Sequence, residues 1–204
     1  MEMVGRETLA ERLFFFLSGI LVGVPVALFF EGVSHLWFTS IGVATFVAPF
    51  VEEFAKADPL FFRYERTGRS LMFLGLLSGL GFGIAEFAVY VVSGVPFFLR
   101  LPAIAFHAAG TSIVGYGVYK RSAFRYYLLP VGLHFLNNLF ASLGWLWLVG
   151  GVAATLVSYY LAYRYWKLSA TPTPSASHVS RFCTNCGKEV PPGAAFCFSC
   201  GMKQ

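Results

Sequence analysis

The stretch Leu13–Phe30, LFFFLSGILVGVPVALFF, contains no charged side chain. A helix needs about 20 mostly apolar residues to cross a bilayer, with a range of about 17–25. The stretch is longer than the ~7–15-residue apolar region of a signal peptide, and no small-x-small cleavage site follows it. We therefore predict that it is a retained first membrane span.

The rest of the chain continues this pattern. Hydrophobic residues make up 57% of the sequence and charged residues 12%, whereas a soluble domain carries roughly 25% charged residues. Five further apolar segments are candidate spans. They are Leu36–Ala57, Leu71–Val95, Leu101–Tyr119, Tyr126–Leu143 and Trp145–Tyr165. The sequence thus predicts an all-α, polytopic bundle of about six transmembrane helices, with the bilayer as its solvent.

The distribution of positive charge predicts the orientation of this bundle. With six spans, every Lys and Arg except Arg100 falls on the side that holds both termini. Cytoplasmic loops of membrane proteins carry such an excess of Lys and Arg. We expect an integral cell membrane protein with cytoplasmic N- and C-termini. The net charge of +5 then reflects topology, and no nucleic-acid partner is expected.

The composition changes after Trp166 and divides the chain into three parts. Residues 1–167 form the predicted membrane domain. Residues 168–180 are rich in Pro, Ser and Thr, which is typical of an extended linker. Residues 181–204 contain every cysteine of the chain, so we predict a separate small module there.

The cysteines form two CxxCG units, Cys183-Thr184-Asn185-Cys186-Gly187 and Cys197-Phe198-Ser199-Cys200-Gly201, around Pro191-Pro192-Gly193. Two such turns predict a tetrahedral zinc site with Cys183, Cys186, Cys197 and Cys200 as ligands. The alternative, two disulfides, is disfavoured by the reducing cytoplasm. So short a module cannot build a sufficient apolar core, so zinc would supply its folding energy. Four thiolates would occupy every coordination position of the zinc and leave none for water or substrate, so we expect the zinc to be structural.

The second predicted span carries a pair of carboxylates, Glu52 and Glu53, shortly after Pro49. Ionisable groups inside a membrane are costly and commonly mark function. Glu52 and Lys56 are four residues apart and can form an ion pair on one helix face. The alternative is that both glutamates are solvated charges at the cytoplasmic end of the helix.

Further polar residues fall within later spans. Glu86 lies deep in the third span, with no charged neighbour in sequence, His107 lies in the fourth, and His134 and Asn138 lie one turn apart in the fifth. Glutamate and histidine in one pocket could activate water and stabilise an oxyanion. They could also bind a divalent metal, or form a polar network that only holds the bundle together. Spacing alone does not separate these possibilities.

These residues resemble the motifs of the PrsW family of intramembrane proteases. The matching pattern is Glu52-Glu53-x-x-Lys56, Gly81-Phe82-Gly83-x-x-Glu86-x-x-x-Tyr90, His107 before Gly115-Tyr116-Gly117, and His134-x-x-x-Asn138. The resemblance covers about residues 44–142. The C-terminal module is similar to the zinc ribbons appended to many prokaryotic membrane proteins.

The resemblance implies a glutamate-type endopeptidase that cleaves a membrane-anchored protein, for example an anti-sigma factor. It implies that Glu52 and Glu53 activate water and that His107 and His134 assist. Asn138 would stabilise the oxyanion or orient His134, and Glu86 would belong to the site or its support. The family usually has Asn after this last glutamate, whereas here Phe87 follows, which weakens a chemical role for Glu86.

The expected cofactor is structural zinc, with no catalytic metal expected in the bundle. The expected partners are a membrane-anchored substrate, the lipid bilayer and a protein recognised by the ribbon. A silent scaffold and a small proton or cation transporter are the alternative functions. One difficulty is depth, because the predicted spans place Glu52 near the inner leaflet and His107 near the outer one.

Overall fold

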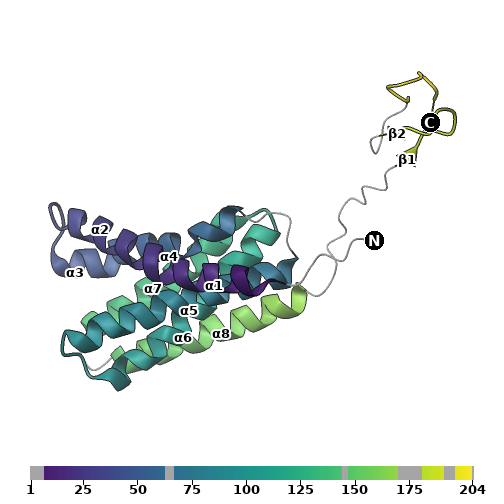
Figure 1. Cartoon of the computed structure of the whole chain (residues 1–204). Helices are drawn as coiled ribbons and strands as arrows, with labels where there is room; N and C mark the ends of the chain where they lie inside the picture. The colour runs from purple at the N-terminus through teal and green to yellow at the C-terminus, as the bar shows by residue number, and fades with distance from the viewer. Residues whose placement is uncertain (1–6, 63–66, 144–146, 170–180, 191–195, 204) are drawn as a thin grey trace. The chain divides into compact units, whose positions relative to one another are not determined.

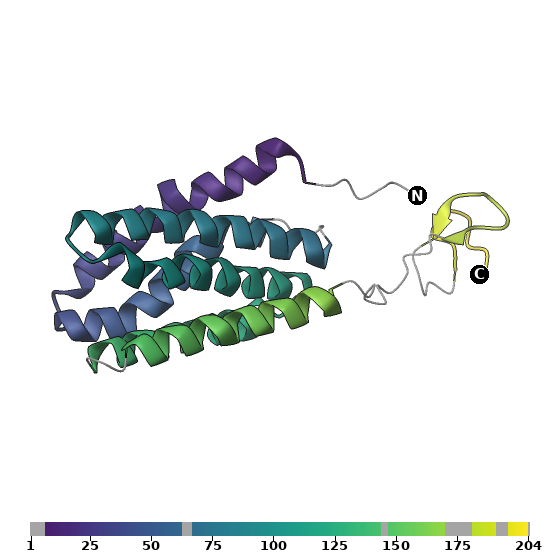
Figure 2. The same ribbon diagram turned by 90° about the horizontal axis from the view of Figure 1, so that it is seen from below.

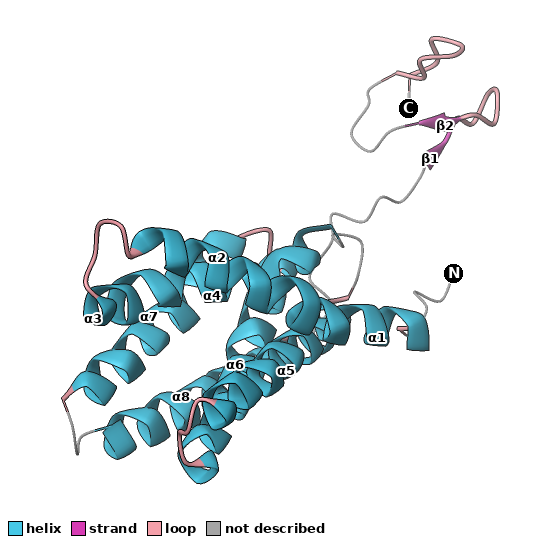
Figure 3. Ribbon diagram, turned by 60° about the vertical axis from the view of Figure 1, so that its left-hand side comes forward, coloured by secondary structure: helices cyan, strands magenta, loops and turns pink. Residues whose placement is uncertain are grey.

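The computed structural model describes residues 7–62, 67–143, 147–169, 181–190 and 196–203. It divides into two compact units, Met1–Ala170 and Thr171–Gln204, and each is considered by itself. The first unit is helical and the second contains two short strands (Figure 3). Most of the predicted linker and the stretch Pro191-Pro192-Gly193 between the two CxxCG units lie outside the described residues.

The first apolar stretch forms one helical rod built from α1 (Leu9–Ser18), the π-helical turn η1 (Gly19–Gly23) and α2 (Val24–Ser34) (Figure 1). The rod begins at Thr8, whose side chain accepts from the Glu11 backbone N–H while the Glu11 side chain accepts from the Thr8 backbone N–H. This reciprocal cap satisfies two N–H groups that the helix would otherwise leave unpaired.

The second rod consists of α3 (Ser40–Gly42), η2 (Val43–Val47), α4 (Ala48–Ala57) and η3 (Asp58–Phe62). The prediction that this span begins at Leu36 is wrong. Helix begins only at Ser40, because the Thr39 side chain accepts from the Gly42 backbone N–H and so fixes the start.

Four longer helices complete the bundle. They are α5 (Gly68–Val92), α6 (Phe97–Tyr119), α7 (Ala123–Ser142) and α8 (Trp147–Leu168). Helices α5 and α6 lie in the middle, with α1 along one side and α8 along the other (Figure 2). The observed bounds differ from the predicted spans by a few residues, as is usual at helix ends.

The helical fold of an integral membrane protein is confirmed. Within the described residues, the stretches Leu9–Ser34, Gly68–Val92 and Phe97–Tyr119 are long and apolar enough to cross a membrane. The second rod and α7 are less apolar because they carry the predicted site residues, such as Glu53 and His134. The number of about six spans therefore stays a prediction.

Glycines set the spacing of the central helices. A Cβ at Gly75 would meet the backbone carbonyl of Thr111, one at Gly79 would meet that of His107, and one at Gly83 would meet Ile104. Small residues let membrane helices approach closely. The backbone of α6, including that of His107, therefore rests directly on α5.

Replacing Gly79 with alanine is expected to destabilise the bundle by about 1–3 kcal/mol, because overpacking forces the backbones apart. The matched control is Gly132→Ala on α7, where an added Cβ meets nothing within 4 Å. Detergent-denaturation midpoints of the two variants would measure the difference. Equal midpoints would contradict the role of Gly79 in the contact.

Candidate active site and zinc centre

A cavity of about 140 Å³ lies inside the bundle. Residues of α2, η2, α4, α5, α6, α7 and α8 line it. Its polar lining comprises Glu31, Glu52, Glu86, Tyr90, Arg100, His107, His134, Asn137, Asn138 and Thr155. A water molecule occupies about 30 Å³ in the liquid, so the cavity has room for a few waters among these groups.

Helix α4 points its two adjacent glutamates in different directions. Glu52 lines the cavity, whereas Glu53 is fully buried behind it. Glu53 Oε1 accepts from Lys56 Nζ at 2.7 Å and from His134 Nδ1 at 3.0 Å. The predicted partner of Lys56 is therefore corrected from Glu52 to Glu53, three residues before it.

The Glu53 contact fixes the tautomer of His134. Because the carboxylate accepts, Nδ1 carries the proton and Nε2 keeps a free lone pair. That Nε2 atom lies 3.8 Å from Glu52 Oε2. Glu52 Oε2 is itself buried and has no hydrogen-bond partner among the described residues.

Lys56 also organises the second histidine. Its Nζ donates to His107 Nδ1 at 2.7 Å, and an ammonium group can only donate. The proton of His107 is therefore on Nε2, which donates to Glu86 Oε2 at 2.8 Å. One buried ammonium thus holds both Glu53 and His107.

Glu86 is not without a charged partner. Arg100, in the first turns of α6, donates to Glu86 Oε1 at 2.7 Å and lies 3.7 Å from the centre of the Tyr90 ring. This partner could not be recognised as a neighbour in the sequence because it is 14 residues away. Glu86 links Arg100 to His107 and so supports the site.

The expected difference in depth between the polar residues is absent. The ring centres of His107 and His134 are 5.4 Å apart, and ligand atoms of Glu52, His107 and His134 all lie within 4.8 Å of one another. Asn138 Nδ2 donates to the Ala44 carbonyl at 2.8 Å, and its Oδ1 accepts from Asn137. This contact holds α7 against η2 at the level of the cavity.

Sequence reasoning missed Glu31 and Arg100 as site residues. Glu31 lies in α2, one residue past the predicted end of the first span, and lines the same cavity. Arg100 was the single exception to the sorting of positive charges. That exception was the signal that could have identified it.

The donors also fit a divalent cation. Glu52, His107 and His134 each offer a ligand atom, and these atoms all lie within 4.8 Å of one another. Carboxylate and imidazole are common zinc ligands. Glu52 Oε2 and His134 Nε2 have free lone pairs for an ion. His107 Nε2 would have to lose its proton and its hydrogen bond to Glu86 before it could bind the ion.

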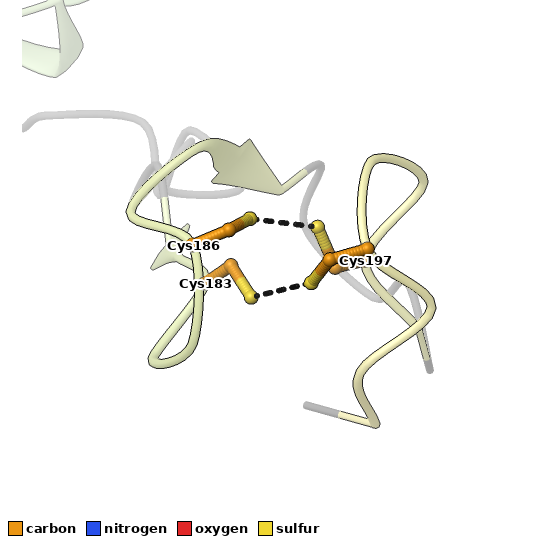
Figure 4. Close-up of side chains that lie close together, drawn as sticks. Cys183, Cys186 and Cys197 are labelled. Carbon is orange, nitrogen blue, oxygen red and sulfur yellow. Dashed lines mark hydrogen bonds between the residues drawn. The ribbon is translucent and has the colours of Figure 1, made fainter.

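The second unit holds the cysteine cluster. Strands β1 (Arg181–Phe182) and β2 (Glu189–Val190) pair antiparallel, and the turns close at Gly187 and Gly201, whose φ values are +68° and +72°. This left-handed conformation suits glycine. The sulfurs of Cys183 and Cys200 are 3.5 Å apart, and those of Cys186 and Cys197 are 3.7 Å apart (Figure 4).

The four cysteines are free thiols arranged as a metal site. Hydrogen bonds from the backbone N–H groups of Cys186 and Asn185 lower the pKa of Cys183 to about 6. The thiolate is the form that binds metal. The geometry agrees with a structural zinc held by four thiolates.

A helical membrane bundle that gathers carboxylates and imidazoles around a buried cavity has the features of a membrane-embedded hydrolase. Residues 7–165 match the model of the PrsW family of intramembrane metalloproteases, and residues 182–204 match a zinc-ribbon domain. The chain belongs to the PrsW family. It is a membrane protease that acts on membrane-embedded protein, and its ribbon carries structural zinc. No curated protein and no solved structure matches the chain.

Arg100→Gln is expected to lower kcat of peptide-bond cleavage by about 10–100-fold, the usual effect of losing a group that orients a catalytic residue. KM should change little, and Arg100→Lys should restore part of kcat because it keeps the charge beside Glu86. The control is Arg12→Gln, whose partner Glu7 lies on the first rod's N-terminal end. Equal activity in Arg100→Gln and Arg12→Gln would contradict the inference that Arg100 orients Glu86 and, through it, His107.

Proposed function

We propose that Glu52 is the general base of peptide-bond hydrolysis in this cavity. The observation that carries the proposal is the unpartnered Glu52 Oε2, buried 3.8 Å from the free lone pair of His134 Nε2. A separation above 3.5 Å between two acceptors is suited to a bridging water. Such a water would donate one O–H to each atom and keep a lone pair for the substrate.

The hydrolysis then follows from these groups. Glu52 takes one proton of the water as its oxygen attacks the carbonyl carbon, which forms a tetrahedral oxyanion. Glu52 returns that proton to the amide nitrogen, and the C–N bond breaks to release an amine and a carboxylic acid, whose proton then passes to the amine. The second N–H of the Asn138 amide is the proposed oxyanion donor. Its first N–H holds the Ala44 carbonyl.

The other charged and imidazole groups of the site position this chemistry. Glu53 keeps His134 in the tautomer that leaves Nε2 free, and Lys56 neutralises Glu53 and holds His107. Glu86 and Arg100 fix the opposite side of the His107 ring. These roles rest on the hydrogen bonds of 2.7–3.0 Å that join the residues.

A second candidate mechanism, through a divalent cation, is supported by the fit of Glu52, His107 and His134 to such an ion and by the metalloprotease description of the matching family. These three residues would hold the ion. The chemistry supplied there would be a lower pKa of a coordinated water and polarisation of the scissile carbonyl. In that arrangement Glu53 still orients His134, and Lys56 still orients Glu53.

Metal removal separates the two mechanisms. The test uses the full chain with Cys183→Ser and Cys197→Ser, so that ribbon zinc does not enter the metal analysis. We expect no stoichiometric metal in the bundle and unchanged cleavage after treatment with a chelator. One ion per chain, lost together with activity and restored with it, would replace the glutamate mechanism by the metal mechanism.

We propose a membrane-anchored regulatory protein, such as an anti-sigma factor, as the substrate class, on the basis of the family resemblance. The excess of Lys and Arg on one side supports cytoplasmic termini. The ribbon would then meet its own protein partner in the cytoplasm. Its exposed Phe182, Phe196 and Phe198 side chains are available for such a contact.

A further inference from the structure

A second, basic pocket lies at the end of the bundle where α6 ends and α7 begins. It has a volume of about 420 Å³. Its lining residues are Lys120, Ser122, Arg125, Tyr126, Leu129 and Tyr165. A span leaves the hydrocarbon core at its ends, so a pocket in this position lies at the level of the lipid headgroups.

The pocket carries positive charge without compensation. Lys120 and Arg125 both line it, no acidic side chain does, and neither cation forms an ion pair among the described residues. Lys120 Nζ lies 5.7 Å and 5.3 Å from the ring centres of Tyr116 and Tyr119. This contact orients the ammonium group and leaves its N–H donors available.

The walls of the pocket are fixed by packed aromatic rings. Tyr116 and Tyr165 stack at 4.8 Å, and Tyr126 lies edge-on to both, at 5.2 Å from Tyr116 and 5.3 Å from Tyr165. The pocket is therefore bounded by α6, α7 and α8. Ser122, at the start of α7, makes no capping hydrogen bond with its side chain, so its hydroxyl remains a possible donor to a ligand.

The pocket also has an apolar edge. Leu129 lines it and is 37% exposed. In a membrane protein, exposed side chains of this kind contact lipid chains. A ligand that fits both the basic residues and the apolar edge of the pocket has an anionic head and an apolar tail.

We propose that this pocket binds the phosphate headgroup of an anionic phospholipid, with Lys120 and Arg125 on the phosphate and Leu129 against the acyl chain. Basic pockets between membrane helices are suited to such headgroups. Free phosphate shares the headgroup chemistry but would gain nothing from the apolar edge.

The test is native mass spectrometry of the full chain, released from detergent and titrated with phosphatidylglycerol, phosphatidylcholine or inorganic phosphate. One phosphatidylglycerol should bind in preference to phosphatidylcholine. Lys120→Gln combined with Arg125→Gln should weaken that binding by about 30-fold, since each basic residue near an anionic headgroup contributes about fivefold. The charge-matched control is Arg164→Gln with Lys167→Gln on α8, residues that do not line the pocket.

Two results would overturn the proposal. Equal losses in the two double variants would show that general surface charge attracts the lipid, without a defined pocket. Inorganic phosphate that binds as tightly as phosphatidylglycerol would show that the apolar edge is unused and that the ligand is not a lipid.

Discussion

Glu52→Gln is expected to lower the rate of cleavage of a membrane-anchored substrate by about 10²–10⁴-fold, the usual contribution of a general base. Glutamine keeps the size of the side chain and most of its hydrogen bonds but cannot take a proton from water. The protein should still fold, because Glu52 Oε2 has no hydrogen-bond partner to lose among the described residues. The measurement is a single-turnover cleavage assay in proteoliposomes.

The matched control is Glu7→Gln, which changes the same charge at a position outside the cavity. Glu53→Gln should also be impaired, because the amide no longer fixes the tautomer of His134 or neutralises Lys56. If both the Glu52 and the Glu53 variants cleaved at full rate, the glutamate mechanism would fail. Cleavage would then depend on another group as the base.

Cys183→Ser is expected to unfold the ribbon and to reduce its zinc from one ion per chain to none. Zinc binding contributes an apparent ~10–16 kcal/mol in zinc-finger peptides, far more than the apolar contacts of so small a unit. The buried cluster of this unit is formed by Cys183, Val190 and Cys197, so two of its three members are themselves zinc ligands. Metal analysis together with limited proteolysis would measure the loss.

The control for this change is Ser199→Ala. It removes an exposed hydroxyl but keeps the backbone N–H that donates to Cys197 Sγ at 3.4 Å. The bundle should resist proteolysis in both variants, because the two units are compact separately. A wild-type protein with neither zinc nor free thiols would instead establish the disulfide interpretation.

The helices and several of the polar residues that line the cavity could be predicted from the sequence because both depend on local signals. Apolar runs of the right length define helices, and a polar side chain within such a run is visible by itself. The pairing of those side chains could not be predicted. Glu53 and His134 are 81 residues apart, and Lys56 can reach either glutamate of α4 until His107 fixes its position.

The depth of each residue in the membrane could not be predicted from the sequence either. The predicted second span began at Leu36, whereas helix begins at Ser40. No local sequence pattern reveals the offset between two neighbouring rods along the bundle axis. Glycine contacts such as that of Gly79 with the His107 carbonyl set this level, and they depend on the partner helix.

The burial of the site has a consequence for the conformation of the substrate. Glu52, His107 and His134 are 7%, 1% and 4% exposed. In a helix the Cα atoms lie about 2.3 Å from the axis, whereas the side chains extend the diameter to about 10–12 Å, so the side chains cover the backbone. We therefore expect the scissile bond to reach these residues on an unwound, extended strand. We also expect substrates with glycine or proline near the cleaved bond to be favoured, because these residues weaken a helix.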